Sequence, residues 1–120
     1  MRFDPMIPIW AQVVEQLQLD MVTGRLQPGS KMPSGRDLAV RFTINPNTAA
    51  RVYQEMESLG LCEPRRGLGT FVTEDAGRIE ALRRQMAEDA LNRFLVSLAG
   101  LGMTPADAVT MLREHEQDAQ

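Results

Sequence analysis

The sequence predicts a mainly α-helical fold with a small β-wing: a winged helix-turn-helix domain over residues 1–73, followed by a two-helix region over residues 74–120. Three observations lead to this prediction. Apolar residues recur at helical spacing in three successive segments. A short hairpin pattern with a glycine-rich, arginine-bearing loop follows the third segment. The remaining chain shows two further helical patterns separated by glycines.

The first helix is expected from Ile9 to about Thr23, because apolar residues recur every four positions along it. These residues are Ile9, Val13, Leu17 and Met21. Pro8 suits the start of a helix, where its missing N–H would have no helical partner. Gly24 is placed to end the helix, because glycine adopts the left-handed conformation at little cost.

A second helix is expected to start at Ser34, whose hydroxyl can cap it, with Asp37 at the capping-box position. Its inward-facing residues would be Leu38, Ala39 and Phe42. The segment Thr43–Pro46 ends this helix, because the residue before a proline avoids the α conformation.

A third helix is expected to open at Asn45 or Pro46 and to end at Gly60. Its apolar stripe consists of Ala49, Val52, Tyr53, Met56 and Leu59. Two short strands, Leu61–Pro64 and Thr70–Thr73, are expected next. The loop Arg65–Gly69 between them contains glycines that can adopt a positive φ.

The last part of the chain reads as a long amphipathic helix from about Glu74 to Leu98, a break at Gly100 and Gly102, and a short helix capped by Thr104. Only 48 residues follow Val72, too few to enclose a ligand cavity of roughly 300 Å³ or more. The apolar faces are therefore expected to pack against a second copy of the chain. The expected dimerisation residues are Leu82, Met86, Leu91, Phe94, Leu95, Leu98, Met111 and Leu112. The alternative is a tail that folds back on the winged domain of a monomer.

Positive charge is concentrated in the middle of an acidic chain. The whole sequence has a net charge of −3, whereas residues 24–72 hold seven Lys or Arg residues against four Asp or Glu residues. A local basic face is what phosphate binding needs, so the overall acidity does not argue against nucleic acid.

Several classes of protein are not supported by the sequence. It has no membrane-length apolar run, and its one cysteine, Cys62, predicts an inert buried thiol in a cytoplasmic protein. With a single histidine, His115, and no Cys/His cluster or paired carboxylates of suitable spacing, we expect no metal site, no cofactor and no enzyme activity.

The start of the third helix has side chains that suit the major groove of DNA. Asn can bond adenine, Thr can bond base edges and Arg prefers guanine, while free N–H groups at the helix start favour phosphate. The hairpin loop suits a groove-probing wing. The expected DNA-binding residues are Ser34, Arg36, Asn45, Asn47, Thr48, Arg51, Arg65, Arg66 and Gly67. Two alternatives stay open: Asn45 as a helix cap only, and Arg36 as a surface residue paired with Asp37 or Glu63.

The chain resembles the GntR family of bacterial transcription regulators, specifically its short YtrA-like branch. The resemblance covers about residues 7–72. It rests on Pro8-Ile9-Trp10, Gly24-Arg25-Leu26-Gln27-Pro28-Gly29, Met32-Pro33-Ser34-Gly35-Arg36-Asp37-Leu38-Ala39, Asn45-Pro46-Asn47-Thr48, Leu59-Gly60-Leu61 and Arg65-Arg66-Gly67-Leu68-Gly69-Thr70-Phe71-Val72.

This resemblance implies a homodimer that binds a near-palindromic DNA operator, usually as a repressor, and by analogy an ABC-transporter operon as its target. It places Arg36, Thr48, Arg51 and Arg66-Gly67 near positions that touch DNA in the family. Ala50 departs from branches that have an arginine there, so their base specificity does not transfer. A small hydrophobic effector at the dimer interface is left open, and the alternative function is a winged-helix protein-interaction module that does not bind DNA.

Overall fold

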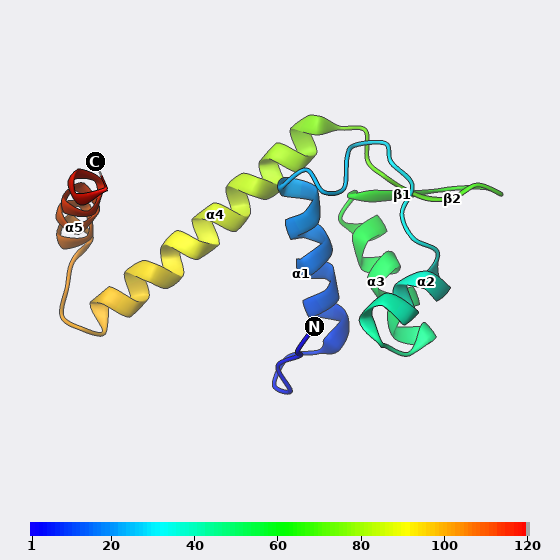
Figure 1. Cartoon of the computed structure of the whole chain (residues 1–120), viewed down its shortest axis with the longest axis horizontal. Coiled ribbons are helices and arrows are strands. Elements are labelled where there is room, and N and C mark those ends of the chain that lie inside the picture. Colours follow the sequence, from blue (N-terminus) through cyan, green and yellow to red (C-terminus); the bar gives the residue numbers. More distant parts are fainter. Residues whose placement is uncertain (120) are drawn as a thin grey trace. The chain divides into compact units, whose positions relative to one another are not determined.

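The computed structural model describes residues 1–119, which form five helices and one two-stranded sheet (Figure 1). In chain order the elements are α1 (Ile9–Val22), α2 (Gly35–Phe42), α3 (Pro46–Ser58), β1 (Cys62–Arg65), β2 (Gly69–Val72), α4 (Ala76–Ala99) and α5 (Pro105–Asp118). This order confirms the predicted mainly α fold with a β-wing. The strands lie within one residue of their predicted bounds, but Arg65 belongs to β1 and not to the loop.

The chain forms two compact units. The first, called the winged unit here, is Met1–Leu82, and the second, called the tail unit, begins at Arg83. The winged unit extends beyond residue 73 because Ile79 and Leu82, in the first turns of α4, pack against its core. The division into a DNA-binding region of residues 1–73 and a dimerisation region of residues 74–120 stays a prediction about function.

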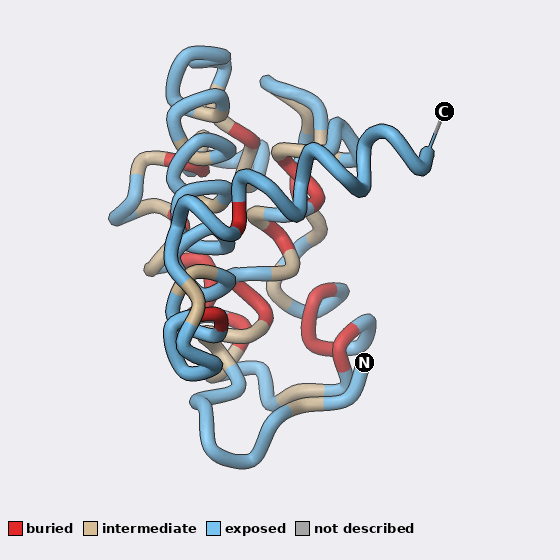
Figure 2. Tube along the Cα trace, turned by 90° about the vertical axis from the view of Figure 1, so that its left-hand side faces the viewer, coloured by how far each residue is buried: buried red, intermediate tan, exposed pale blue. Residues whose placement is uncertain are grey.

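The core of the winged unit lies between α1, α2 and α3. Figure 2 marks the buried residues in red along the trace. Leu17 of α1, Leu38 of α2 and Met56 of α3 are fully buried there. Each such side chain stabilises the fold by about 1.5–3 kcal/mol when it leaves water. The hydrophobic core therefore holds α3 against both α1 and α2, which fixes where the start of α3 lies.

Side-chain caps set where α2 and α3 begin. The Ser34 hydroxyl accepts the backbone N–H of Asp37 at 3.1 Å, and the Asn45 side-chain oxygen accepts the N–H of Asn47 at 2.7 Å. Between the helices, Thr43 has a φ of +54°, the one positive φ outside glycine among the residues described. This left-handed turn ends α2 and redirects the chain into α3.

The complete capping box is found at α5 and not at α2. The Thr104 hydroxyl accepts the N–H of Asp107, and the Asp107 carboxylate accepts the N–H of Thr104. At α2 only the Ser34 half of the predicted box is present. Within the tail unit as described, the buried residues are Leu98 and Ala108.

The wing is an antiparallel hairpin in which Cys62 pairs with Val72 and Arg65 pairs with Gly69. An isolated bridge joins Lys31 to Phe71, so the segment before α2 also lies along β2. At the tip, Gly67 has a φ of +76° and open space around it. No helix that the structure describes over residues 1–119 is long and apolar enough to span a membrane.

Candidate nucleic-acid interface

The first turn of α2 presents Ser34 and Arg36 to solvent. Within residues 1–119, Arg36 has no carboxylate within 4.0 Å, so the surface ion pair with Asp37 or Glu63 does not form. Glu63 pairs with Arg65 instead, at 3.0 Å. Arg36 is thus a positive group that is available to a ligand.

The first turn of α3 presents Asn45 and Asn47 to solvent and leaves Thr48 half-buried. Asn45 does cap the helix, as one of the two sequence interpretations expected. Pro46 has no N–H, and the N–H of Asn47 donates to Asn45. The N–H of Thr48 and the helix dipole are therefore what favour an anion in front of this turn. The cap and an anion contact are compatible, because the Asn45 amide nitrogen takes no part in the capping bond.

Arg51 lies on the second turn of α3, where its guanidinium contacts other groups of the protein. Its central carbon is 4.4 Å from the centre of the Trp10 ring, and its Nη2 atom is 4.0 Å from Glu55 Oε2. The side chain is still 50% exposed. A cation over an exposed aromatic ring contributes about 0.5–1 kcal/mol, so the contact with Trp10 stabilises the observed position of Arg51.

Arg65 links the base of the wing to the segment before α4. Its Nη2 atom donates to Glu63 at 3.0 Å and to Glu74 at 3.3 Å, and its guanidinium lies 4.2 Å from the centre of the Phe71 ring. The hydrogen bond to Glu63, followed by the bond to Glu74, raises the pKa of Arg65 above its ordinary value. These contacts fit a side chain that holds the wing in shape better than one that reaches for DNA.

Arg66 and Gly67 lie at the tip of the wing, and both are exposed. Lys31 is a cation that the sequence-based set of site residues did not include. Its Cε atom would be 3.0 Å from a Cβ on Gly69, so its side chain runs beside the wing. The predicted β-hairpin alone could not reveal this, because the Lys31–Phe71 bridge joins segments far apart in sequence.

Two interactions fix α2 relative to its neighbours. The Tyr53 hydroxyl of α3 donates to the carbonyl oxygen of Pro33, just before the α2 cap. Near the end of α1, the buried carboxylate of Asp20 lies 3.6 Å from Arg41 of α2 and 3.8 Å from Arg25. The Asp20 side chain also accepts a bond from Gln16 at 3.1 Å. The helix-turn-helix is thus held at both ends of α2.

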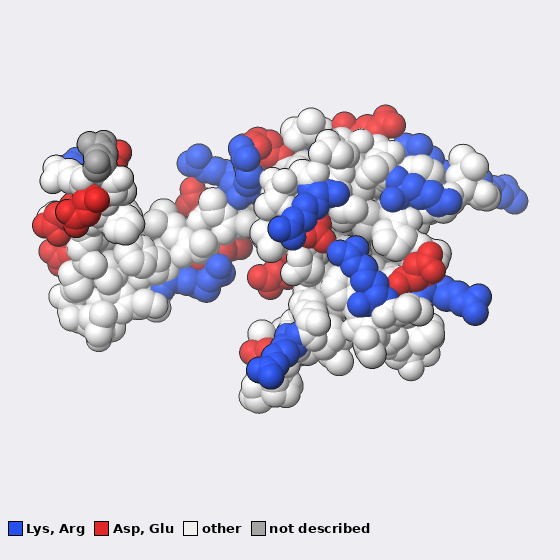
Figure 3. All heavy atoms as spheres, viewed as in Figure 1, with Lys and Arg blue, Asp and Glu red and all other residues white. Residues whose placement is uncertain are grey.

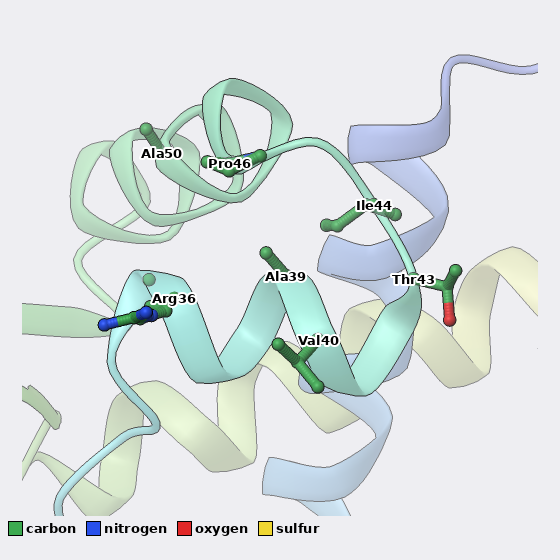
Figure 4. A pocket seen from close by; sticks show the side chains of 8 residues that line it. Arg36, Ala39, Val40, Thr43, Ile44, Pro46 and Ala50 are labelled. Carbon is green, nitrogen blue, oxygen red and sulfur yellow. The ribbon is translucent and has the colours of Figure 1, made fainter.

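A groove of about 640 Å³ lies between α2 and α3 (Figure 4). Arg36, in the first turn of α2, lies at one end of the groove, and Ala39 points toward α3. The lining residues are Gly35, Arg36, Ala39, Val40, Thr43, Ile44, Pro46 and Ala50. Apart from Arg36 and Thr43, these side chains are apolar or absent, so the groove is an apolar surface with a cation at its rim.

Lys and Arg side chains are prominent over the winged unit and at the wing in Figure 3. Asp and Glu side chains gather at α5 in the same view. This agrees with the charge division along the sequence, in which the basic excess lies in residues 24–72. A duplex would therefore meet its favourable charges on the winged unit.

Cys62 is buried in β1, as predicted for an inert thiol. Burial, with a smaller contribution from the charge of Glu57, raises the pKa of Cys62 to about 12. The reactive thiolate is therefore scarce at neutral pH.

The expected dimerisation residues fall into three groups. Leu82 is half-buried and packs on the winged core, whereas Leu98 is buried within its own tail unit. Met86 and Leu95 are half-buried. Exposed apolar side chains remain at Leu91, Phe94, Met111 and Leu112.

The family model described as bacterial regulatory proteins, gntR family, matches residues 10–72. Among curated proteins, an uncharacterized HTH-type transcriptional regulator of Bacillus subtilis, YhcF, is 39% identical over 86% of this chain and 85% of its own length. The HTH-type transcriptional repressor YtrA of the same organism is 34% identical, over 68% of this chain and 67% of its own.

Solved structures agree with these matches. A GntR family transcriptional regulator from Listeria monocytogenes has a TM-score of 0.86 at 32% identity, covering 93% of this chain and 98% of its own. AraR(DBD) in complex with operator ORX1 has a TM-score of 0.57 at 28% identity, covering 61% of this chain and 93% of its own.

Proposed function

This chain belongs to the GntR family and is a DNA-binding transcription regulator, and from that premise we propose that it represses transcription as a homodimer bound to a near-palindromic operator. The observation that best supports this mode of binding is that two helix starts and the wing tip, all on the winged unit, have exposed polar side chains. The starts of α2 and α3 and the tip of the wing present Arg36, Asn47 and Arg66, and neither arginine has an acidic partner in the described chain.

The proposed contacts follow from this arrangement. In the helix-turn-helix mode of binding, the start of α3 enters the major groove, so Asn47 and Thr48 meet base edges. Ser34 and Arg36 meet the backbone or a base edge beside them, and the tip residues Arg66 and Gly67 meet a neighbouring groove. Asn45, Arg51 and Arg65 stay in the proposed site. Their contacts within the chain also give them a role in positioning α3 and the wing.

Dimerisation is supported by the apolar surface of the tail unit. In the described residues this unit buries Leu98 and Ala108, while Leu91, Phe94, Met111 and Leu112 are each at least 37% exposed. A second copy packed about a two-fold axis would remove these side chains from water, and two-fold symmetry matches a near-palindromic operator. The side chains that we propose at the interface are these four, together with the half-buried Met86 and Leu95.

The repressor role rests on the likeness to YtrA, which is named as a repressor, and we place this chain with the YtrA-like branch for the same reason. Control of an ABC-transporter operon follows by analogy with that branch. A regulator of bacterial transcription works where the chromosome lies, so we propose the cytoplasm as its location.

Binding is tested by fluorescence anisotropy with labelled DNA from upstream of the protein's own gene. We expect retention at moderate salt and a steep salt dependence. Arg36→Ala or Arg66→Ala should weaken binding by about 1–3 kcal/mol where a base is read, or lower the salt slope by about 1 where a phosphate is met. The control is Arg84→Ala, which removes an equal charge from an 80% exposed side chain of α4. If the protein binds none of the duplexes at moderate salt, the result would favour the protein-interaction module instead.

Dimerisation is tested by sedimentation equilibrium. Phe94→Glu should shift the protein toward the monomer and weaken operator binding, since it places a charge in the proposed apolar interface. Circular dichroism checks that the variant keeps its helices. A wild-type protein that sediments as a monomer at micromolar concentration, free and on DNA, would contradict the proposal.

A further inference from the structure

We propose that the groove between α2 and α3 is a contact surface for the 5-methyl groups of thymine in the operator, with Ala50 as the residue that touches them. The inference rests on the proposed function, because it requires α3 to enter the major groove. It adds a specificity determinant to the hydrogen-bonding side chains Asn47 and Thr48.

The groove presents apolar carbon where an HTH helix would face DNA. Pro46 and Ala50 are four residues apart on α3, so they share one side of the helix, and both are exposed. Across the groove, Val40 of α2 is 75% exposed. Scattered exposed apolar residues are ordinary on a protein surface. Here they line one groove of about 640 Å³ that runs along α2 and the first turns of α3.

The charge around the groove indicates what kind of partner it accepts. Arg36 lies on the rim without an acidic partner in the described chain, and no Asp or Glu lines the groove. The positive end of the α3 dipole favours anions. The groove therefore suits a polyanion that also carries an apolar group, whereas an apolar peptide would leave Arg36 unpaired.

The major groove of DNA offers both negative charge and one kind of apolar group. Its walls carry phosphates and its floor carries hydrogen-bonding edges, and the apolar group exposed on that floor is the thymine 5-methyl. Ala50 is small enough to let the helix approach the floor closely. A longer side chain there would hold the helix away from the methyl group.

The test uses full-length protein and duplexes that it enriches from a random-sequence library. Each thymidine of an enriched duplex is replaced singly by deoxyuridine, which removes the methyl and keeps every hydrogen-bonding group. We expect about fourfold weaker binding at one or two positions in each half-site, the change that corresponds to one lost carbon contact. At the other positions we expect equal affinities.

A pair of variants assigns the effect to Ala50. Ala50→Ser places a hydroxyl against the methyl group with little change in size, and the preference for thymine should fall below about twofold because the hydroxyl resists desolvation. The matched control is Ala81→Ser on α4, which is exposed and lies outside the groove, and which should keep the fourfold preference.

Failure of the methyl contact and failure of the proposed function give different outcomes. Enrichment of a specific duplex with equal affinity for its uridine versions overturns the methyl contact and leaves the regulator intact. A preference for thymine that persists unchanged in Ala50→Ser also overturns it, because the methyl is then read elsewhere. Failure to enrich any sequence overturns both.

Discussion

Replacing Tyr53 by phenylalanine removes one hydroxyl group and the bond that ties α3 to the segment before α2. The Tyr53 hydroxyl donates to the carbonyl oxygen of Pro33, and the residue is only 8% exposed in the winged core. Phenylalanine keeps the packing of the ring. The change therefore isolates one long-range hydrogen bond, made across 20 residues of sequence.

The expected loss follows from that bond. A typical intramolecular hydrogen bond contributes about 0.5–1.5 kcal/mol, and a buried acceptor left without a donor costs about 1–3 kcal/mol. Because Pro33 is half-buried, water can satisfy part of its carbonyl, and we expect a loss of about 1–2 kcal/mol. A unit of this size has a total stability of only about 4–12 kcal/mol. The loss should lower the melting temperature by about 4–16 °C.

Urea unfolding followed by circular dichroism measures this loss. The control is Ser58→Ala, which removes an exposed hydroxyl from the same helix and should change the free energy of unfolding by less than about 0.5 kcal/mol. A Tyr53→Phe variant as stable as the wild type would show that this bond does not hold α2 and α3 together. Amide exchange at Met32, whose N–H donates to the Thr70 carbonyl oxygen at 2.7 Å, should quicken in the variant, because the segment before α2 is released.

Two further predictions concern the junction between α3 and the wing. Gly60→Ala should destabilise the protein by about 1–2 kcal/mol, because φ is +73° there and the new Cβ would lie 2.2 Å from Arg78 Nη1. Adding Arg78→Ala should remove the steric clash but not the backbone strain. Full recovery of stability in the double variant would show that the backbone at this φ is unstrained. Cys62 should make unfolding easier at alkaline pH. Its thiol ionises near pH 9 when unfolded and at about 12 when folded, so the free energy of unfolding should fall as the pH rises from 9 toward 12. Denaturant titrations at pH 8 and 10 should show a smaller fall in Cys62→Ala, and equal falls would contradict the assignment.

Local chemistry made much of the fold predictable. The helix starts at Ser34, Asn45 and Thr104 depend on a hydroxyl or amide within three residues of the N–H that it accepts. The helical period of apolar residues and the glycines at turns are equally local signals. These signals placed α1 to α4 and both strands within a few residues of their observed bounds, and they placed the start of α5 at Thr104. The expected short last helix is instead 14 residues long, Pro105–Asp118.

The roles of individual cations could not be predicted in the same way. Arg36, Arg51 and Arg65 look alike in sequence. In residues 1–119, however, Arg36 has no acidic partner, Arg51 lies against Trp10 and Arg65 bridges two acids. The difference arises from partners up to 41 residues away, because α1 packs beside α3 and places Trp10 under Arg51.

The sequence by itself determined the order of the elements, the location of the basic segment and the polar residues at the helix starts, since each depends on neighbours within one or two turns of the chain. The tertiary structure decided which of those residues are exposed and unpaired. It also revealed the buried Asp20 beside two arginines, the Lys31 side chain along the wing and the apolar groove at Ala50. Burial and ion pairing depend on distance in space, and only the packing of α1, α2, α3 and the wing sets those distances.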